Sequence, residues 1–170
     1  MSKWAATFET FTPTTVSNAT NFTDGGHWTI QGGTATQRFD VYEIYLVGQS
    51  TAAGSMNSIV WTRDSTVGAT LTALSSLQSQ GSLDPASVAP TSAPIAFSAA
   101  TTKPQRSVSA AKLVLGFNPF GGVARWWVPA GSGAEFKLLG NAASNGEASI
   151  SCTTIGTPGA MMATIQYEIY

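Results

Sequence analysis

"FDVYEIYLV", Phe39–Val47, is the most strand-like run in the chain, and it decides the fold class. An ideal strand places alternate side chains on opposite faces, and here both faces are apolar apart from Asp40 and Glu43. One face holds Tyr42, Ile44 and Leu46, and the other holds Phe39, Val41, Tyr45 and Val47. Apolar residues on both faces are typical of a strand in the middle of a covered sheet. We therefore expect Phe39–Val47 to be a central strand that is covered on both sides.

Shorter alternating runs lie on both sides of this strand, and turns rich in Gly, Pro and Asn separate them. The expected strands are Trp4–Phe11, His27–Ile30, Met56–Thr62, Lys112–Phe117, Val123–Val128, Glu135–Leu139, Glu147–Thr154 and Met161–Tyr170. In the last three, the inward side chains are expected to be Phe136, Leu138, Ala148, Ile150, Cys152, Ile165, Tyr167 and Ile169. Eight or nine short strands without a long helix predict one all-β domain over residues 1–170, an antiparallel β-sandwich of jelly-roll type.

One long connection, residues 64–107, interrupts the regular spacing of strands. It is rich in Pro, Ala and Ser, and four of the chain's eight prolines lie within Gly81–Pro104: Pro85, Pro90, Pro94 and Pro104. Connections of this length inside a compact domain are usually functional or flexible. Two interpretations stay open, a Greek-key crossover packed on its own domain and an arm that reaches a neighbouring subunit.

The charge of the chain limits its partners. Only 10% of the residues are charged, against about 25% in an average soluble domain, which favours a surface covered by other subunits. A merely Ser/Thr-rich β-protein would have the same composition. The net charge is −1 and the eight basic residues are scattered, so neither a nucleic-acid surface nor polybasic membrane attachment is expected. The sequence contains neither an apolar run of about 18 residues nor a secretion signal.

Catalytic and metal-binding arrangements are poorly represented. His27 is the only histidine, and the turn sequence Asp24-Gly-Gly-His27 predicts a solvated loop residue with no third metal ligand nearby in sequence. Cys152 is expected to be a small core residue, and a single cysteine excludes an internal disulfide. Glu135 and Glu147 begin successive strands and are expected to keep the strand ends solvated rather than to form a catalytic pair. We therefore predict no catalytic residue, no metal and no cofactor.

The adjacent tryptophans in "GGVARWWVPAG", Gly121–Gly131, must point to opposite faces of a strand. Trp126 shares its face with apolar residues only and is predicted to be the core indole. Trp127 shares its face with Arg125 and is predicted to lie on a partly wet surface. The residues predicted for an interface with other protein subunits are Trp127, Arg125, Trp4, Phe8, Pro90 and Pro94. The competing interpretation places Trp127 beneath the Gly81–Pro104 connection of its own chain.

Exposed tryptophans on a β-sandwich would also suit a sugar-binding platform. The candidates for such a platform are Trp4, Trp28, Trp61 and Trp127. With five tryptophans in a chain of this size, most are expected to be structural.

Several runs resemble small virion proteins of tailed bacteriophages and prophages. They are "VYEIYLVGQSTAAGSMNSIVWTRDSTVGAT" (Val41–Thr70), "LDPASVAPTSAPIAF" (Leu83–Phe97), "TTKPQR" (Thr101–Arg106) and "GGVARWWVPAGSGAEFKLLGN" (Gly121–Asn141). The closing "YEIY" extends the resemblance over Phe39–Tyr170, whereas residues 1–36 lie outside it and could form an N-terminal strand or arm. Trp127 is a departure, because an aliphatic residue is usual there.

This resemblance implies a jelly-roll or related sandwich that decorates a phage capsid as a cement protein, often as a trimer. It implies the major capsid protein and further copies of the chain as partners, and the virion, assembled in the host cytoplasm, as the location. It carries no catalytic residues. The alternative function is a tail-associated, fibre-associated or glycan-binding β-sandwich module. An enzyme is the least favoured class.

Overall fold

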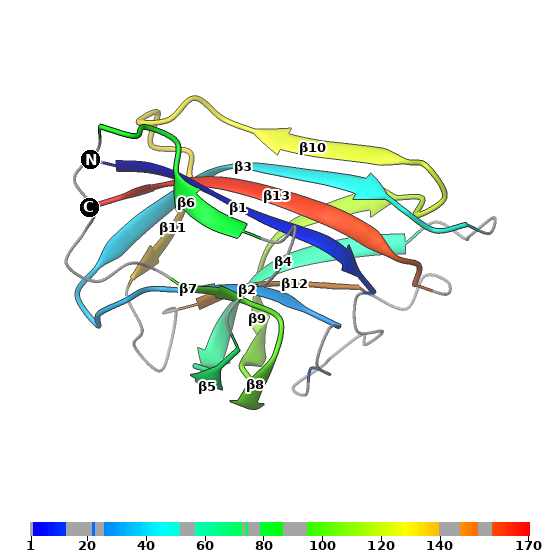
Figure 1. Cartoon of the computed structure of the whole chain (residues 1–170), viewed down its shortest axis with the longest axis horizontal. Helices are drawn as coiled ribbons and strands as arrows, with labels where there is room; N and C mark the ends of the chain where they lie inside the picture. Colours follow the sequence, from blue (N-terminus) through cyan, green and yellow to red (C-terminus); the bar gives the residue numbers. More distant parts are fainter. Residues whose placement is uncertain are drawn as a thin grey trace.

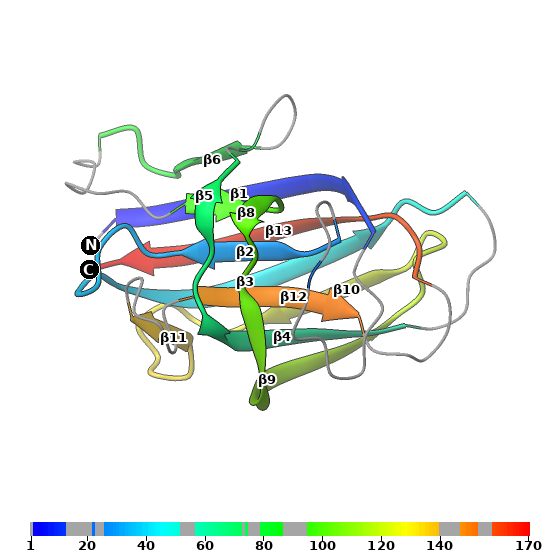
Figure 2. The same cartoon turned by 90° about the horizontal axis from the view of Figure 1, so that it is seen from below.

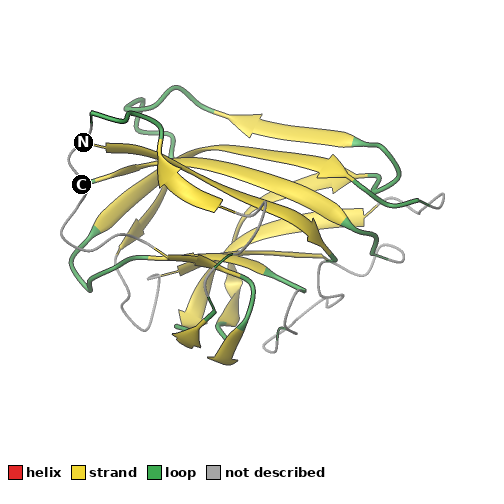
Figure 3. Cartoon of the chain, in the orientation of Figure 1, coloured by secondary structure: helices red, strands yellow, loops and turns green. Residues whose placement is uncertain are grey.

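The computed structural model describes residues 2–12, 22, 26–51, 57–72, 74, 79–86, 95–139, 147–152 and 158–170. Within these residues every regular element is a β-strand, and Figure 3 shows no helix among them. All strand pairs are antiparallel. The predicted all-β, antiparallel class is therefore confirmed. Over the same residues, no helix long and apolar enough to cross a membrane is found.

Two larger sheets form two layers, and Figures 1 and 2 show them stacked. Sheet A has the order β10-β3-β13-β1-β6, and β11 pairs with β3 on the β10 side. Its strands are β1 (Ser2–Phe11), β3 (Arg38–Gly48), β6 (Ser79–Ser82), β10 (Val123–Trp127), β11 (Phe136–Leu139) and β13 (Met161–Ile169). Sheet B has the order β7-β2-β12-β4-β9. Its strands are β2 (Trp28–Gln31), β4 (Asn57–Thr66), β7 (Ile95–Phe97), β9 (Gln105–Phe117) and β12 (Glu147–Cys152).

Apolar side chains from both sheets fill a single core. Sheet A contributes Trp4, Ala6, Phe8, Phe11, Phe39, Val41, Ile44, Leu46, Leu138, Met161, Ala163, Ile165, Tyr167 and Ile169, and sheet B contributes Trp28, Ile30, Trp61, Ala96 and Phe117. The inward phase predicted for Leu138, Ile165, Tyr167 and Ile169 is confirmed, and Phe136 packs at the margin of the core. The side chains of Ala148, Ile150 and Cys152 lie outside the described part.

The central strand β3 contains a bulge that the alternation of the sequence does not predict. Gln166 pairs with Glu43 but the next residue of β13, Tyr167, pairs with Val41, so Tyr42 is the extra residue. A bulge reverses the alternation beyond it. Phe39 and Val41 therefore point into the same core as Ile44 and Leu46 rather than to the opposite face.

The outer face of β3 is consequently not covered as predicted. Glu43, Tyr45 and Val47 are only half-buried. The central position of the strand, between β13 on one side and β10 with β11 on the other, is confirmed. The expectation of a cover on both faces was wrong, because the bulge collects the apolar residues of both halves of the strand on one face.

The long connection forms more regular structure than the sequence predicts. β4 and β9 extend into it, β6 pairs with β1 at one edge of sheet A, and β7 pairs with β2 at one edge of sheet B. β5 (Ala69–Leu71) and β8 (Ala100–Thr102) form a separate ribbon on the side of sheet B away from sheet A (Figures 1 and 2). The described parts of the connection thus pack on their own chain.

The N-terminal strand is an inner strand of sheet A, because β1 lies between β13 and β6. Ser2 pairs with Ile169, so the two ends of the chain lie side by side, as Figure 1 shows. β1 is therefore part of the sheet and not a projecting arm.

Candidate interaction surface on strand β10

A tight turn positions β10 after β9. Asn118 organises the turn, since its carbonyl oxygen accepts a hydrogen bond from the Gly122 amide at 2.9 Å and its side-chain oxygen accepts one from the Phe120 amide at 2.9 Å. Gly121 has a φ of 72°, a left-handed conformation that glycine adopts at little cost. Gly122 has no room for a side chain, because a Cβ atom there would lie 2.2 Å from the Asn118 oxygen. The sequence Asn-Pro-Phe-Gly-Gly therefore specifies this turn.

The alternation predicted for β10 is confirmed on its outer side. Arg125 and Trp127 point outward and are exposed, whereas Ala124 and Trp126 are partly buried and pack against the core. The Arg125 Nε donates to the Glu43 Oε1 at 2.8 Å. Trp127 lies opposite Glu43 in the β10–β3 register. Glu43 therefore lies beside both outward side chains: its carboxylate binds the Arg125 guanidinium, and its position in β3 is paired with Trp127.

Three large apolar side chains are exposed along β10 and the turn before it. Trp127 is 54% exposed, Val123 in the same phase of β10 is 59% exposed, and Phe120 in the preceding turn is 52% exposed. This exposure contradicts the interpretation that Trp127 lies beneath the chain's own long connection. Sequence reasoning missed Phe120 and Val123. An apolar residue at the tip of a polar turn, and the shared phase of Val123 with Trp127, were the signals that could have found them.

Two of the proposed interface residues were misplaced. Trp4 and Phe8 are buried in the core between the sheets, since β1 presents alternate side chains to that core. They offer almost no surface to a partner. Pro90 and Pro94 lie outside the described residues.

A charged cluster occupies the outer face of sheet A at the opposite end of β3. Asp40 has a side chain only 2% exposed, and it receives the Lys137 Nζ at 2.9 Å and the Arg38 Nε at 3.2 Å. Lys3 lies 3.9 Å from Glu168, which also accepts a hydrogen bond from the Tyr170 hydroxyl. Buried carboxylates are retained only when cations or hydrogen bonds compensate them. The cations of the cluster compensate the buried acids.

Glu135 belongs to this cluster, contrary to the expectation of a solvated strand end. Its side chain is 1% exposed, and the Lys137 Nζ lies 3.8 Å from its Oε2. Backbone amide groups, first its own and then those of Gly131 and Ser132, outweigh the cost of burial and lower its pKa below the ordinary value. In the described structure, no donor meets either carboxylate oxygen at the distance and angle of a hydrogen bond. Electrostatic attraction from the amides and the lysine therefore keeps this carboxylate ionised.

The predicted environment of His27 was wrong. The ring is completely buried, stacks on Phe22 at a centroid distance of 4.9 Å and meets the edge of Phe97 at 5.9 Å. Asp24 lies outside the described residues, as do the side chains of Glu147 and Cys152. Among the side chains that the structure describes, no group of three His, Cys, Asp or Glu could hold a metal ion.

The tryptophans do not form a sugar platform on the surface. Trp4, Trp28 and Trp61 are buried. Trp28 and Trp61 contact each other in the core with ring centroids 5.9 Å apart. Trp127 is the exposed one of the four candidates, and the expectation that most of the tryptophans are structural is confirmed for the other three.

Comparison with known proteins gives no family assignment. No family model matches the chain, and no curated protein matches it.

Proposed function

We propose that this chain is a non-enzymatic virion structural protein, a decoration or cement protein that binds and stabilises the head of a tailed bacteriophage. Its partners are the major capsid protein and further copies of the chain, as a trimer, in a virion assembled in the host cytoplasm. The resemblance of Phe39–Tyr170 to small phage virion proteins supports this proposal. A decoration protein stabilises the shell because it adds binding free energy to the assembled state alone.

The fold belonging to this proposal is a jelly roll. Eight strands support it, in the order β1-β13-β3-β10 in one layer and β2-β12-β4-β9 in the other. Along the chain these strands alternate between the layers except at β4 and β9, which are neighbours in sheet B. Two Greek keys wound into a sandwich give this order. A jelly roll hosts many functions, so the fold by itself carries no conclusion about capsids.

The observation that carries the proposal is the exposure of apolar side chains on β10 and on the turn that joins it to β9. Phe120, Val123 and Trp127 are three of the seven large hydrophobic side chains exposed in the described structure. Arg125 lies between two of them, and Trp and Arg are the side chains that most often dominate the centres of protein interfaces. In a chain with so few charges, such a surface suits a lasting protein contact.

The cations of sheet A support a protein partner rather than a nucleic acid or an anionic membrane. Lys3, Arg38, Arg125 and Lys137 each lie within 4 Å of a carboxylate of the same chain, namely Glu168, Asp40, Glu43 and Asp40. Binding to phosphates depends on cations that are free to replace condensed counterions. These four side chains are already neutralised.

The test is binding to phage heads that lack the protein. Purified chain mixed with such heads should co-sediment with them and raise the temperature at which they release DNA. Light scattering of the free protein should give a mass of more than one chain, that is, a multiple of 17.6 kDa above the monomer. Failure to co-sediment with every head form of the phage would overturn the proposal. Enrichment on isolated tails instead would support the tail-associated alternative.

A further inference from the structure

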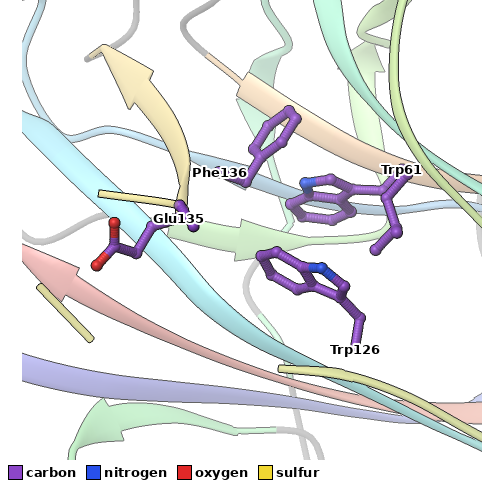
Figure 4. A pocket seen from close by; sticks show the side chains of 6 residues that line it. Trp61, Trp126, Glu135 and Phe136 are labelled. Atoms are coloured by element: carbon purple, nitrogen blue, oxygen red, sulfur yellow. The ribbon is translucent and has the colours of Figure 1, made fainter. Parts of the chain in front are cut away.

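A second feature lies on the inner side of β10, where a pocket of about 220 Å³ opens at the margin of the core. Figure 4 shows its side chains. Its lining residues are Trp61, Leu113, Trp126, Ala134, Glu135 and Phe136. They come from both sheets, since Trp61 and Leu113 belong to β4 and β9, whereas Trp126 and Phe136 belong to β10 and β11. The pocket therefore lies at the open edge between the two layers.

The pocket lies where β10 and β11 part along β3. β11 pairs with β3 up to Val41 and β10 pairs with it from Glu43 onward, so the two strands part at Tyr42. The amide of Val128 still donates to the Tyr42 oxygen at 2.9 Å, and after it the chain leaves the sheet. Trp126 and Phe136 are inward side chains on either side of this junction, and both line the pocket.

The walls of the pocket are aromatic faces. Figure 4 shows Trp61 above Trp126, with Phe136 beside them and the Glu135 carboxylate pointing away from the three rings. Trp61 and Phe136 contact each other edge to face, with centroids 5.7 Å apart and planes at 69°. Trp61 is further held by Trp28 behind it. The rings that line the pocket are thus supported by the core and are not free surface side chains.

From these observations we infer that the pocket binds one planar, uncharged, apolar ring of the size of benzene to indole. An apolar cavity of about 150 Å³ is enough for benzene, and drug-sized ligands need roughly 300–1,000 Å³. A ring stacks well on aromatic walls when the centroids lie about 4.5–7 Å apart. A sugar ring carries several hydroxyl groups that need polar partners, whereas the carboxylate of Glu135 turns away and the Trp61 Nε1 offers one unpartnered donor.

The test uses the free protein and indole, read by the indole N–H signals of the five tryptophans in a nitrogen–proton NMR spectrum. Indole should shift the signals of Trp61 and Trp126 and saturate at millimolar concentration, while the exposed Trp127 signal stays in place. Methyl β-glucoside at the same concentration should leave all five signals unmoved. Equal shifts at Trp127, no saturation, or a response to the glucoside alone would overturn the inference.

A blocking variant makes the test specific. Ala134 is exposed at the rim of the pocket, so Ala134→Leu should narrow the mouth without disturbing the fold and weaken indole binding at least tenfold. Ala35→Leu, at an equally exposed loop position away from the pocket, is the matched control and should bind indole as the unchanged chain does. If both variants bind indole alike, the ring does not occupy this pocket.

A second arm separates the two sources of such a ring, a free small molecule and an aromatic side chain of a partner. Competition between indole and phage heads for the protein indicates a partner side chain, and simultaneous binding of both indicates a free molecule. The first arm needs no phage heads. Failure of the pocket is therefore distinguishable from failure of the proposed function.

Discussion

The adjacent tryptophans of β10 differ in what they contribute, and the sequence predicts the difference only in part. Alternation correctly separates an outer Trp127 from an inner Trp126. It does not show that Trp126 faces a pocket instead of a filled core, because the gap depends on where β10 and β11 part on β3. Local alternation determines which face a side chain takes, and distant pairing determines what covers that face.

Trp126→Ala should therefore lower stability by less than a fully buried indole would. We expect about 1–3 kcal/mol, below the ~3–5 kcal/mol typical of a buried Trp or Phe. Trp127→Ala should leave the free energy of unfolding within about 0.5 kcal/mol of the unchanged chain, since its ring is largely exposed. Urea denaturation of the two variants measures both values, and an equal loss of stability in both would contradict the assignment.

His27 shows the limit of sequence reasoning at a single residue. Its turn-like neighbours predict a solvated ring, yet Phe22 and Phe97 enclose it. Phe97 follows the long connection and is 70 positions away in the sequence, so no local pattern could have indicated the contact. The prediction of a solvated ring was therefore wrong, and the buried ring is expected to support the core.

His27→Ala should destabilise the fold by about 2–4 kcal/mol, because it removes a buried ring and leaves a cavity. His27→Phe, which keeps a ring between the two phenylalanines, should recover part of that loss. Thermal denaturation followed by circular dichroism compares the variants. A His27→Ala protein that melts with the unchanged chain would show that the ring does not support the core.

At the scale of elements, the sequence predicts most of the strands and their order along the chain, and it misses the exception within β3. Runs with clean alternation, such as Met161–Tyr170, match the observed strand within one residue. In β3 the extra residue Tyr42 makes an apolar run look two-sided when it is one-sided. A bulge shifts the phase of the alternation, and in this run the apolar Tyr45 and Val47 on the outer face conceal the shift.

The junction between β3 and the β9–β10 turn gives a test at this scale. A Cβ atom on Gly48 would lie 2.2 Å from the Pro119 oxygen, and Pro119 also accepts a hydrogen bond from the Ser50 amide at 3.0 Å. Gly48→Ala must therefore push the turn away from β3, and we expect a loss of roughly 1–3 kcal/mol.

Gly81→Ala is the matched control, because a Cβ atom there meets nothing within 4 Å. Its stability should stay within about 0.5 kcal/mol of the unchanged chain. Chemical denaturation of the two variants side by side measures the difference. If Gly48→Ala were as stable as Gly81→Ala, the close approach of Pro119 to β3 would not hold the β9–β10 turn in place.

At the scale of the whole molecule, many of the few charged residues of the chain are brought together on one surface. Eight of the charged side chains lie on the outer side of sheet A, as the two groups around Asp40 and Glu43: Lys3, Arg38, Asp40, Glu43, Arg125, Glu135, Lys137 and Glu168. They are dispersed along the chain, so composition could not have placed them together. Folding lowers the pKa of Glu135 in this set, so the stability of the protein depends on pH through this residue.

The direction of this pH dependence follows from the pKa shift of Glu135. Its pKa is lowered in the folded chain from the ordinary value of 4.5, so its contribution to stability is present above pH 4.5 and is lost as the pH falls through the folded value. Glu135→Gln should therefore flatten the pH dependence of the unfolding free energy below pH 4.5. Denaturation of both proteins between about pH 2 and pH 7 measures the slopes. Identical slopes would contradict an ionised, stabilised Glu135.

In the proposed function, strand β10 and the turn before it are the surface that attaches the protein to the phage head. The most direct measurement is the affinity of the unchanged chain and of Trp127→Ala and Arg125→Ala for heads that lack the protein. Loss of one central interface side chain commonly costs at least about 2 kcal/mol, so each variant should bind at least roughly tenfold more weakly while melting like the unchanged chain. Leu83→Ala, which removes a similarly exposed side chain elsewhere, should bind normally. Unchanged affinity of both β10 variants would contradict the proposal that β10 binds the phage head.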